Sequence, residues 1–250
     1  MTDGWIGVEK HLSWIHKFAR IVVYRTSHAF IGASKNSLEL YRSYGIKDEK
    51  LFQSHLCVDN SRFNNSHSFN SREYDLMYSG QFTERKLPLF FAEVAKKVSE
   101  SLPNIRVLIL GNGPMKDEFF TLLDQYKINY TYPGFLTQEE LPTYYANSKL
   151  FLFPTLLDAW GVVANGAMAS GIPVITTPYA GIINDLILHG QTGYIFSIDS
   201  EIWAKKIVEL LSDSEKWSAM SHAAKEHVKY YNFEIATKGM INAIEYANTN

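Results

Sequence analysis

The spacing of apolar and polar residues predicts short strands that alternate with longer helices along most of the chain. Residues 105–110 are apolar apart from Arg106, which is typical of a strand buried on both faces of a sheet. The predicted strands are residues 28–33, 50–58, 75–79, 105–110, 130–132, 150–153 and 174–177. The predicted helices are residues 8–24, 36–44, 89–100, 115–125, 139–147, 161–170, 203–211 and 215–230. This alternation predicts an α/β fold with a parallel sheet wrapped by helices on both faces.

A polar stretch divides this pattern into two parts. Residues 60–73 contain four Asn and four Ser, a composition that competes with regular structure and favours a linker. We therefore divide the chain at this point. The expected segments are a first part at residues 1–58, a linker at 59–73, a larger α/β domain at 74–230 and a C-terminal segment at 231–250.

Local signals mark several helix ends. Ser34 is a suitable N-cap for the helix at residues 36–44, and Gly45 is expected to end that helix. Pro114 suits the first position of the helix at residues 115–125. These signals strengthen the helix predictions at both places.

Composition and charge exclude several classes of protein. The chain has 250 residues, of which 46% are hydrophobic and 20% charged, as in an ordinary globular protein. Its net charge of −2 does not suggest nucleic-acid binding, and its eight histidines show no spacing typical of metal ligands. The single cysteine, Cys57, and the absence of a visible signal peptide favour a cytoplasmic protein. The helix at residues 8–24 is either a surface helix or one that approaches a membrane.

Residues 150–175 carry the most specific chemistry. They contain a strand, a loop with Asp158, a helix that begins at Gly161, a stop at Gly171 and Pro173, and a second strand. The first turn of such a helix presents free N–H groups and a partial positive charge, which suits a diphosphate. Asp158 is placed to accept hydrogen bonds from sugar hydroxyls. The alternative is that this acid only caps the helix.

This segment resembles the donor-site signature of the retaining, family-four (group 1) glycosyltransferases. Proteins of this family have the GT-B fold, in which two Rossmann-like domains face each other across a cleft. The matching positions are Asp158, Trp160, Gly161, Val162, Val163 and residues 167–173. The resemblance implies that residues 74–230 form the nucleotide-sugar-binding domain, with Trp160 either packing the loop or touching the ligand.

Other segments resemble the family in the same order, from about Ala29 to the C-terminus. In residues 78–86, Lys86 falls on the second position of a basic pair that holds the diphosphate. Gln81 occupies the first, where arginine is common, and Arg85 is one residue out of register. Gly111–Pro114 resembles a Gly-x-Gly-Pro turn, which serves either as a tight turn or as a ligand contact. Residues 133–136 resemble the loop whose backbone meets the base.

The resemblance thus implies a complete set of site residues. Asp158 and Lys86 are the expected catalytic residues, although Lys86 also fits an ordinary surface lysine. The expected substrate-binding residues are Gly80, Gln81, Lys86, Gly134, Leu136, Asp158, Ala159, Trp160, Gly161, Val162, Val163 and Gly166. No metal ion and no cofactor are expected, because the nucleoside diphosphate sugar is itself the substrate.

Two departures from the family pattern predict weak or absent activity. Gly166 stands where the family has a second acid that resembles a clamp on the ribose hydroxyls. The loss of a charged hydrogen bond of about 1.5–3 kcal/mol weakens binding by roughly 10- to 150-fold. Residues 1–58 resemble only the last elements of the acceptor domain, and residues 231–247 resemble a helix that crosses back onto it. This truncated remnant is expected to expose apolar surface and to self-associate, or to need a missing N-terminal domain.

The implied reaction is transfer of a sugar from a nucleoside diphosphate sugar to a glycan or lipid-linked acceptor, with retention at the anomeric carbon. By analogy, the resemblance suggests polysaccharide synthesis by a cytoplasmic protein near a membrane. One alternative is a non-catalytic nucleotide-sugar-binding module, which Gly166 and the truncation favour. A nicotinamide-dependent oxidoreductase is disfavoured, because Lys116 occupies the position where its glycine fingerprint needs a third glycine.

Overall fold

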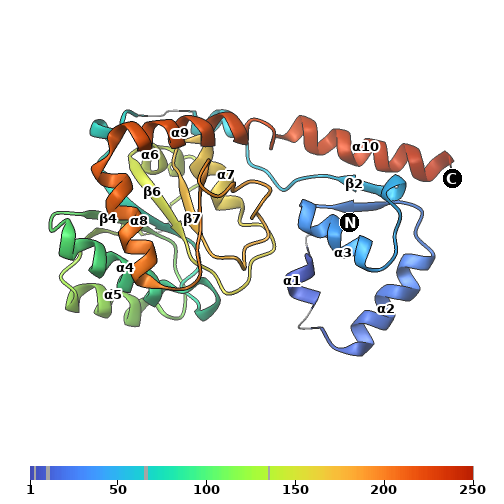
Figure 1. Cartoon of the computed structure of the whole chain (residues 1–250), viewed down its shortest axis with the longest axis horizontal. Helices are drawn as coiled ribbons and strands as arrows, with labels where there is room; N and C mark the ends of the chain where they lie inside the picture. The colour runs from blue at the N-terminus through green and yellow to red at the C-terminus, as the bar shows by residue number, and fades with distance from the viewer. Residues whose placement is uncertain (3, 10–11, 65–66, 135, 250) are drawn as a thin grey trace.

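The computed structural model describes residues 1–2, 4–9, 12–64, 67–134 and 136–249, which form a larger and a smaller body (Figure 1). The larger body is built around a six-stranded sheet, and the smaller body around a two-stranded sheet. The last helix of the chain leaves the larger body and lies along the smaller one (Figure 1). The two chain ends therefore both lie at the smaller body.

The six strands of the larger body are all parallel, in the order β5–β4–β3–β6–β7–β8. They are β3 (Tyr74–Ser79), β4 (Arg106–Leu110), β5 (Asn129–Thr131), β6 (Ser148–Phe153), β7 (Val174–Thr176) and β8 (Gly193–Ile195). This confirms the predicted parallel α/β sheet. The adjacency of β3 and β6 places the loops that follow these two strands side by side, which decides where the site forms.

The edge strand β8 was not predicted from the sequence. It contains only three residues and begins at Gly193, a residue type that usually marks a turn. The glycine is needed because an added Cβ would lie 1.9 Å from the carbonyl oxygen of Val174 on the neighbouring strand. The close approach of the two backbones therefore explains a residue that weakens the strand pattern.

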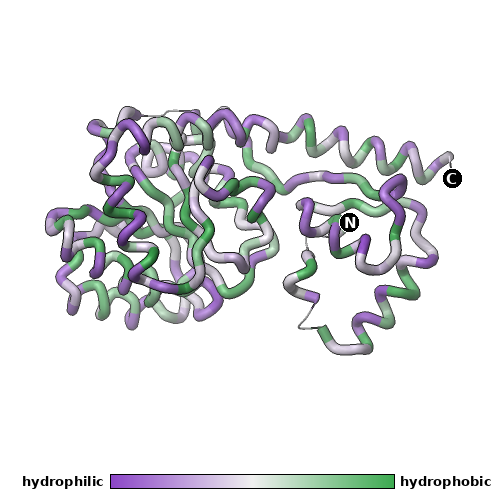
Figure 2. Tube along the Cα trace, viewed as in Figure 1, coloured by the Kyte–Doolittle hydropathy of each residue, from purple (hydrophilic) through white to green (hydrophobic). Residues whose placement is uncertain are grey.

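Helices cover both faces of the large sheet, as predicted. One face is covered by α4 (Pro88–Ser101), α5 (Lys116–Gln125) and α8 (Ser200–Ser212), and the other by α6 (Leu141–Ala146) and α7 (Val162–Ala169). The helix α9 (Ser214–Val228) contributes Trp217 to one apolar cluster and Val228 to the other. Figure 2 shows the hydrophobic residues concentrated along the central strands. The predicted position of Pro114 is wrong, because α5 begins at Lys116 and Met115 is its N-cap.

The smaller body pairs β1 (Phe30–Gly32) with β2 (Leu51–Gln53) in parallel. Its helices are α1 (Ile6–Glu9), α2 (Trp14–Arg25) and α3 (Lys35–Ser43), and α10 (Phe233–Thr249) packs against β1 and β2. Ser34 caps α3 as predicted, since its hydroxyl accepts the N–H of Ser37 at 3.0 Å.

Two predictions for this body are wrong. The single helix predicted at residues 8–24 is two helices, because Ser13 has an extended backbone that separates α1 from α2. Residues 10 and 11 of that prediction lie outside the described part of the chain. The strand predicted at residues 50–58 is limited to β2, and the residues after it run as an extended segment towards the larger body.

The segment at residues 59–73 is held against the larger body by a buried arginine. The Arg72 side chain donates hydrogen bonds to the carbonyl oxygens of Ser148 at 2.6 Å, Ser170 at 2.7 Å and His67 at 3.0 Å. Its guanidinium also lies 4.9 Å from the ring centre of Trp217. Burial lowers the pKa of Arg72 to about 10, so the side chain remains charged at neutral pH. This segment is therefore anchored to the sheet rather than free of it; residues 65 and 66 are not among those described.

Replacing Arg72 with methionine is expected to lower the free energy of unfolding by about 3 kcal/mol, because buried carbonyl groups lose a charged donor. Chemical denaturation measures this loss. The matched control is Arg106→Met, since Arg106 is half exposed and its contact with Glu73 is 3.6 Å long. That change is expected to cost about 0.5 kcal/mol or less. Equal losses in the two variants would contradict the anchoring role of Arg72.

Candidate functional site

The predicted site residues gather where the sheet's carboxyl edge meets the start of α7. A cavity of about 400 Å³ opens there between the loop after β3 and the loop at residues 154–161, which we call the site loop. It is lined by Leu56, Ser79, Gly80, Gln81, Arg85, Lys86, Asp158, Ala159, Trp160, Gly161, Val162 and Val163. Of the predicted substrate-binding residues, only Gly134, Leu136 and Gly166 lie outside this lining. Segments more than 70 residues apart in the sequence thus share one cavity.

Lys86 and Asp158 form an ion pair at the centre of this cavity, with both side chains 11% exposed. The ammonium group of Lys86 also lies 4.5 Å from the ring centre of Phe153, a favourable cation–π position. Burial lowers the pKa of Lys86, and the charge of Asp158 acts against this shift. The alternative of an ordinary surface lysine does not hold, because the Lys86 side chain is only 11% exposed and is paired.

Arg85 supplies a second cation to the same carboxylate. One of its guanidinium nitrogens lies 3.3 Å from Asp158 Oδ2 and donates to the carbonyl of Leu157 at 2.6 Å. The sequence predicted Arg85 to be one residue out of register. Its side chain reaches Asp158 because of the conformation of the loop after β3. Two cations around one carboxylate leave this part of the cavity with a net positive charge, which favours an anionic ligand.

Asp158 does not cap α7. Its Oδ1 atom accepts the backbone N–H of Trp160 at 3.0 Å, which closes a tight turn within the site loop. The N-cap position of α7 is Gly161, which has a left-handed backbone with φ of +89°. No described side chain caps this helix, so its first N–H groups have no side-chain acceptor, and Val162 and Val163 line the cavity. The alternative of Asp158 as a helix cap is therefore wrong.

Trp160 packs inside the protein rather than at the surface, with 1% of its area exposed. Its indole N–H donates to the side-chain oxygen of Asn165 at 2.9 Å. Asn165 is fully buried on α7, and sequence analysis assigned it no role at this site. The only available signal was a polar residue inside an otherwise apolar helix.

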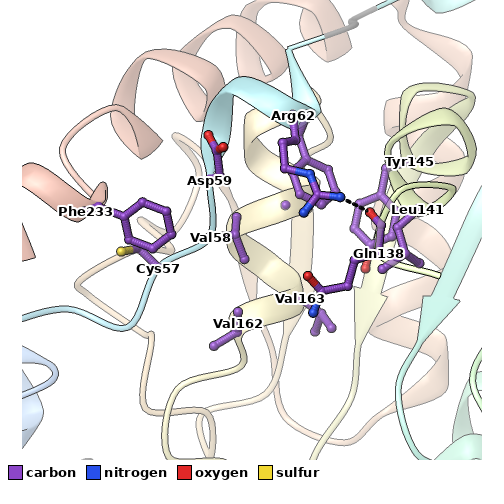
Figure 3. A pocket seen from close by; sticks show the side chains of 12 residues that line it. Cys57, Val58, Asp59, Arg62, Gln138, Leu141, Tyr145, Val162, Val163 and Phe233 are labelled. Atoms are coloured by element: carbon purple, nitrogen blue, oxygen red, sulfur yellow. Dashed lines mark hydrogen bonds between the residues drawn. The ribbon is translucent and has the colours of Figure 1, made fainter.

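A second cavity of about 580 Å³ lies along the side of α7 (Figure 3). It shares Val162 and Val163 with the first cavity, so the two meet at the start of the helix. Its lining consists of Cys57, Val58, Asp59, Arg62, Phe63, Gln138, Leu141, Tyr145, Val162, Val163, Gly166 and Phe233. Across this cavity Arg62 donates to the carbonyl of Gln138 at 2.8 Å (Figure 3).

Gly166 is in close contact with Phe63, a residue of the segment between the two bodies. A Cβ atom added at Gly166 would lie 3.0 Å from the nearest ring carbon of Phe63. Gly134 has a φ of +83°, and Leu136 packs against the second apolar cluster. Both lie outside the two linings, and Phe135, between them, lies outside the described residues. The structure thus brings Gly166, but not Gly134 or Leu136, to the lining of a cavity.

The described ranges contain neither a membrane-spanning helix nor a metal-binding cluster. No helix in them has the length and apolar content that crossing a membrane requires. They also contain no group of three or more His, Cys, Asp or Glu side chains arranged to hold a metal ion.

Comparison with known proteins identifies the family of this chain. The family model described as "Glycosyl transferases group 1" matches residues 59–227. The sulfoquinovosyl transferase SQD2 of Arabidopsis thaliana is 31% identical over 197 residues, which cover 74% of this chain and 38% of that protein. The chain also spans only 44–54% of the length of four further curated relatives that it matches.

Solved structures show the same fold. The C-terminal domain of the group 1 glycosyl transferase LpcC from Francisella tularensis superposes with a TM-score of 0.62 and 22% identity. This match covers 69% of the present chain and 96% of that domain. Anabaena HepE, solved with UDP and glucose, gives a TM-score of 0.70 at 16% identity and covers 98% of this chain and 68% of its own. The architecture is therefore that of GT-B proteins.

Proposed function

Because this chain belongs to the group 1 glycosyl transferases, we propose that it binds a nucleoside diphosphate sugar at the carboxyl edge of its six-stranded sheet. The observation that carries the proposal is the largely buried Lys86–Asp158 pair beside the uncapped start of α7. Cations and free N–H groups that converge on one cavity suit a diphosphate, and a carboxylate suits sugar hydroxyls. HepE and two other similar structures were solved with UDP bound.

The proposed reaction is transfer of the sugar to a glycan or lipid-linked acceptor with retention at the anomeric carbon. As the bond to the diphosphate breaks, negative charge develops on the leaving oxygen. Lys86 and the N–H groups of Val162 and Val163 would stabilise this charge. Asp158 would release Lys86 to the diphosphate and hold hydroxyls of the donor sugar. The groups that bind the acceptor would lie in the acceptor domain, of which residues 1–58 resemble only the last elements.

Each of the two cavities suits a different part of the nucleoside diphosphate sugar. The first contains both cations and the acid, and so suits the diphosphate and sugar. The second is mostly apolar, shares the start of α7, and suits the nucleoside. Gly166 provides no acid at the second cavity, which favours the second candidate function, a nucleotide-sugar-binding module with little or no transfer activity.

Calorimetric titration of the whole chain tests donor binding. UDP, GDP and ADP are the probes, and NAD is the comparison ligand for the oxidoreductase alternative. We expect saturable binding of one nucleoside diphosphate and none of NAD. Hydrolysis of the corresponding nucleotide sugar then separates a transferase from a binding module. Absence of binding by all three diphosphates would refute the proposal.

Gly166→Glu alone is expected to leave nucleotide affinity within about threefold of the parent, because Phe63 lies where the new side chain must pass. Gly166→Glu combined with Phe63→Leu is expected to raise the affinity by about tenfold, the effect of one charged hydrogen bond. Phe63→Leu alone is the control. A double variant that binds no better than this control would show that position 166 does not face the nucleotide.

We also propose that the chain associates through α2. This helix presents Trp14, Phe18 and Val22 at a helical spacing, and the first two side chains are 76% and 62% exposed. Figure 2 shows hydrophobic residues along α2 at the outer side of the smaller body. Apolar patches of this kind usually mark an interface. A second copy of this chain or a separate first domain would cover the patch.

Light scattering tests this association. The parent chain is expected to be larger than its monomer mass of 28.5 kDa, and Trp14→Glu with Phe18→Glu is expected to be a monomer. The control carries the same added charge on α2, as His16→Glu with Ala19→Glu. A parent that is monomeric at all concentrations would argue against self-association.

A further inference from the structure

Polar side chains from both bodies meet at a buried carboxylate at the junction between the two bodies. Asp185, in the segment after β7, is fully buried. Its Oδ2 atom accepts the backbone N–H of Lys35 at 2.7 Å and the side-chain amide of Gln53 at 3.1 Å, both from the smaller body. Its Oδ1 atom accepts the hydroxyl of Tyr231 at 2.6 Å. One carboxylate therefore ties the start of α3, the end of β2 and the segment before α10 to the larger body.

The aromatic ring of Tyr231 connects this carboxylate to the site loop. Its centre lies 5.9 Å from that of Trp160, and the ring of His55 lies 4.5 Å from Tyr231 and 6.1 Å from Trp160. Burial raises the pKa of Tyr231, and the neighbouring charge of Asp185 adds to the shift, so the hydroxyl remains a donor at neutral pH. Trp160 is thus packed directly against the junction.

Trp160 also binds the side chain of Asp158 directly. Its backbone N–H binds one carboxylate oxygen of Asp158, and its indole N–H binds Asn165. The side-chain nitrogen of Asn165 is buried and has no hydrogen-bond partner among the described atoms. Burying an amide nitrogen without a hydrogen-bond partner costs free energy. The position of Asn165 is best explained by the hydrogen bond that its oxygen accepts from the indole of Trp160.

A second connection runs through the backbone. The N–H of Gly181 donates to the carbonyl of Asp158 at 2.8 Å, and an added Cβ at Gly181 would lie 1.9 Å from the carbonyl of Ala159. The Asn36 side chain, from α3, donates to the carbonyl of Ile183 at 3.2 Å. The segment that supports the backbone of Asp158 is therefore the same one that holds the smaller body.

From these contacts we infer that Trp160 is a positioning residue, which couples the orientation of Asp158 to the junction that Asp185 holds together. The inference rests on the proposed function, because it assigns Asp158 to the donor sugar. It means that movement of the smaller body changes the geometry of the donor site. The buried indole of Trp160 thereby links the interface with the acceptor half to the catalytic carboxylate of Asp158.

Hydrogen–deuterium exchange of the whole chain tests the coupling without any ligand. Asp185→Asn and Trp160→Phe are both expected to speed exchange at residues 156–161 by about tenfold relative to the parent. The control for the junction is Ser54→Ala, which removes a buried hydrogen bond to Ala236 of 2.9 Å outside the Asp185 group. The control for the indole is Trp217→Phe, because the indole N–H of Trp217 donates to the Lys149 carbonyl at 2.8 Å outside the site. Unchanged exchange at residues 156–161, or equal changes in variants and controls, would overturn the inference.

A milder variant protects the test against misfolding. Gln53→Met removes one donor to Asp185 and keeps the carboxylate, so it is expected to show the same pattern with a smaller increase. Faster exchange confined to the smaller body in this variant and in Asp185→Asn would show that the junction does not control the site loop, and would overturn the inference.

Nucleotide binding provides a separate readout. In Trp160→Phe, affinity for the nucleotide sugar is expected to fall by about 3- to 10-fold while affinity for the free diphosphate changes less than twofold. A merely structural role would weaken both ligands equally, and that result would overturn the positioning role. If the parent binds no nucleotide, the proposed function fails, and the exchange experiment still decides the coupling.

Discussion

Replacing Lys86 with methionine is expected to weaken binding of the nucleoside diphosphate by about 30- to 1000-fold. Methionine keeps an apolar stem beside Phe153 and removes the charge that faces both Asp158 and the proposed diphosphate. Breaking a buried charge pair that also binds the ligand costs about 2–4 kcal/mol in affinity, which corresponds to this range. Calorimetric titration with the diphosphate that binds the parent chain measures the change.

Two comparisons show whether the charge at this position is responsible. Lys97→Met removes a more exposed lysine that pairs with Glu201 outside the site, and its affinity is expected to stay within twofold of the parent. In the parent, affinity is also expected to fall as the pH rises through the lowered pKa of Lys86, since only the ammonium form binds a diphosphate. An unchanged affinity in Lys86→Met would remove this residue from the proposed site.

Gly239→Ala is expected to destabilise the docking of α10 by about 1–3 kcal/mol. An added Cβ would lie 1.8 Å from the carbonyl oxygen of Gln53 on β2, and this backbone atom cannot rotate away. The helix must therefore move off the smaller body, although alanine favours a helix over glycine by about 1 kcal/mol. Denaturant unfolding and amide exchange in residues 233–249 measure the effect.

Gly166→Ala is the matched comparison, because it is also a glycine inside a helix. Its new Cβ would lie 3.0 Å from the ring of Phe63, a side chain that can shift by a few tenths of an ångström. The helix gain of about 1 kcal/mol then offsets most of the contact, and a change within about 1 kcal/mol is expected. The explanation requires that an added Cβ costs more against a backbone atom than against a side chain that can move. Equal destabilisation in the two variants would contradict it.

The larger sheet was predictable from the sequence because its buried strands are continuous apolar runs. Residues 105–110 and 150–153 illustrate this, and both strands formed close to their predicted bounds. The strand β8 and the break before α2 were missed. The first depends on a backbone contact with a neighbouring strand, and among the described residues of the break Ser13 has an extended backbone.

The site was predictable residue by residue but not as a set of contacts. Lys86 and Asp158 were each expected from the resemblance, whereas their ion pair requires that β3 and β6 be neighbours in the sheet. The spacing of apolar residues does not determine the order of strands. The reach of Arg85 and the bond from Trp160 to Asn165 depend on loop conformation, so only the structure reveals them.

The packing of α10 on β2 has a consequence for how the chain folds as it is made. Ser54 and Ala236, which share a buried hydrogen bond at this contact, are 182 residues apart. At about 5–20 residues per second, a ribosome needs roughly 10–40 s to make the stretch between them. During that time β1 and β2 are not yet covered by α10, while the strands of the larger sheet are being made. The strands β1 and β2 are therefore exposed to chaperones and proteases until α10 has been made.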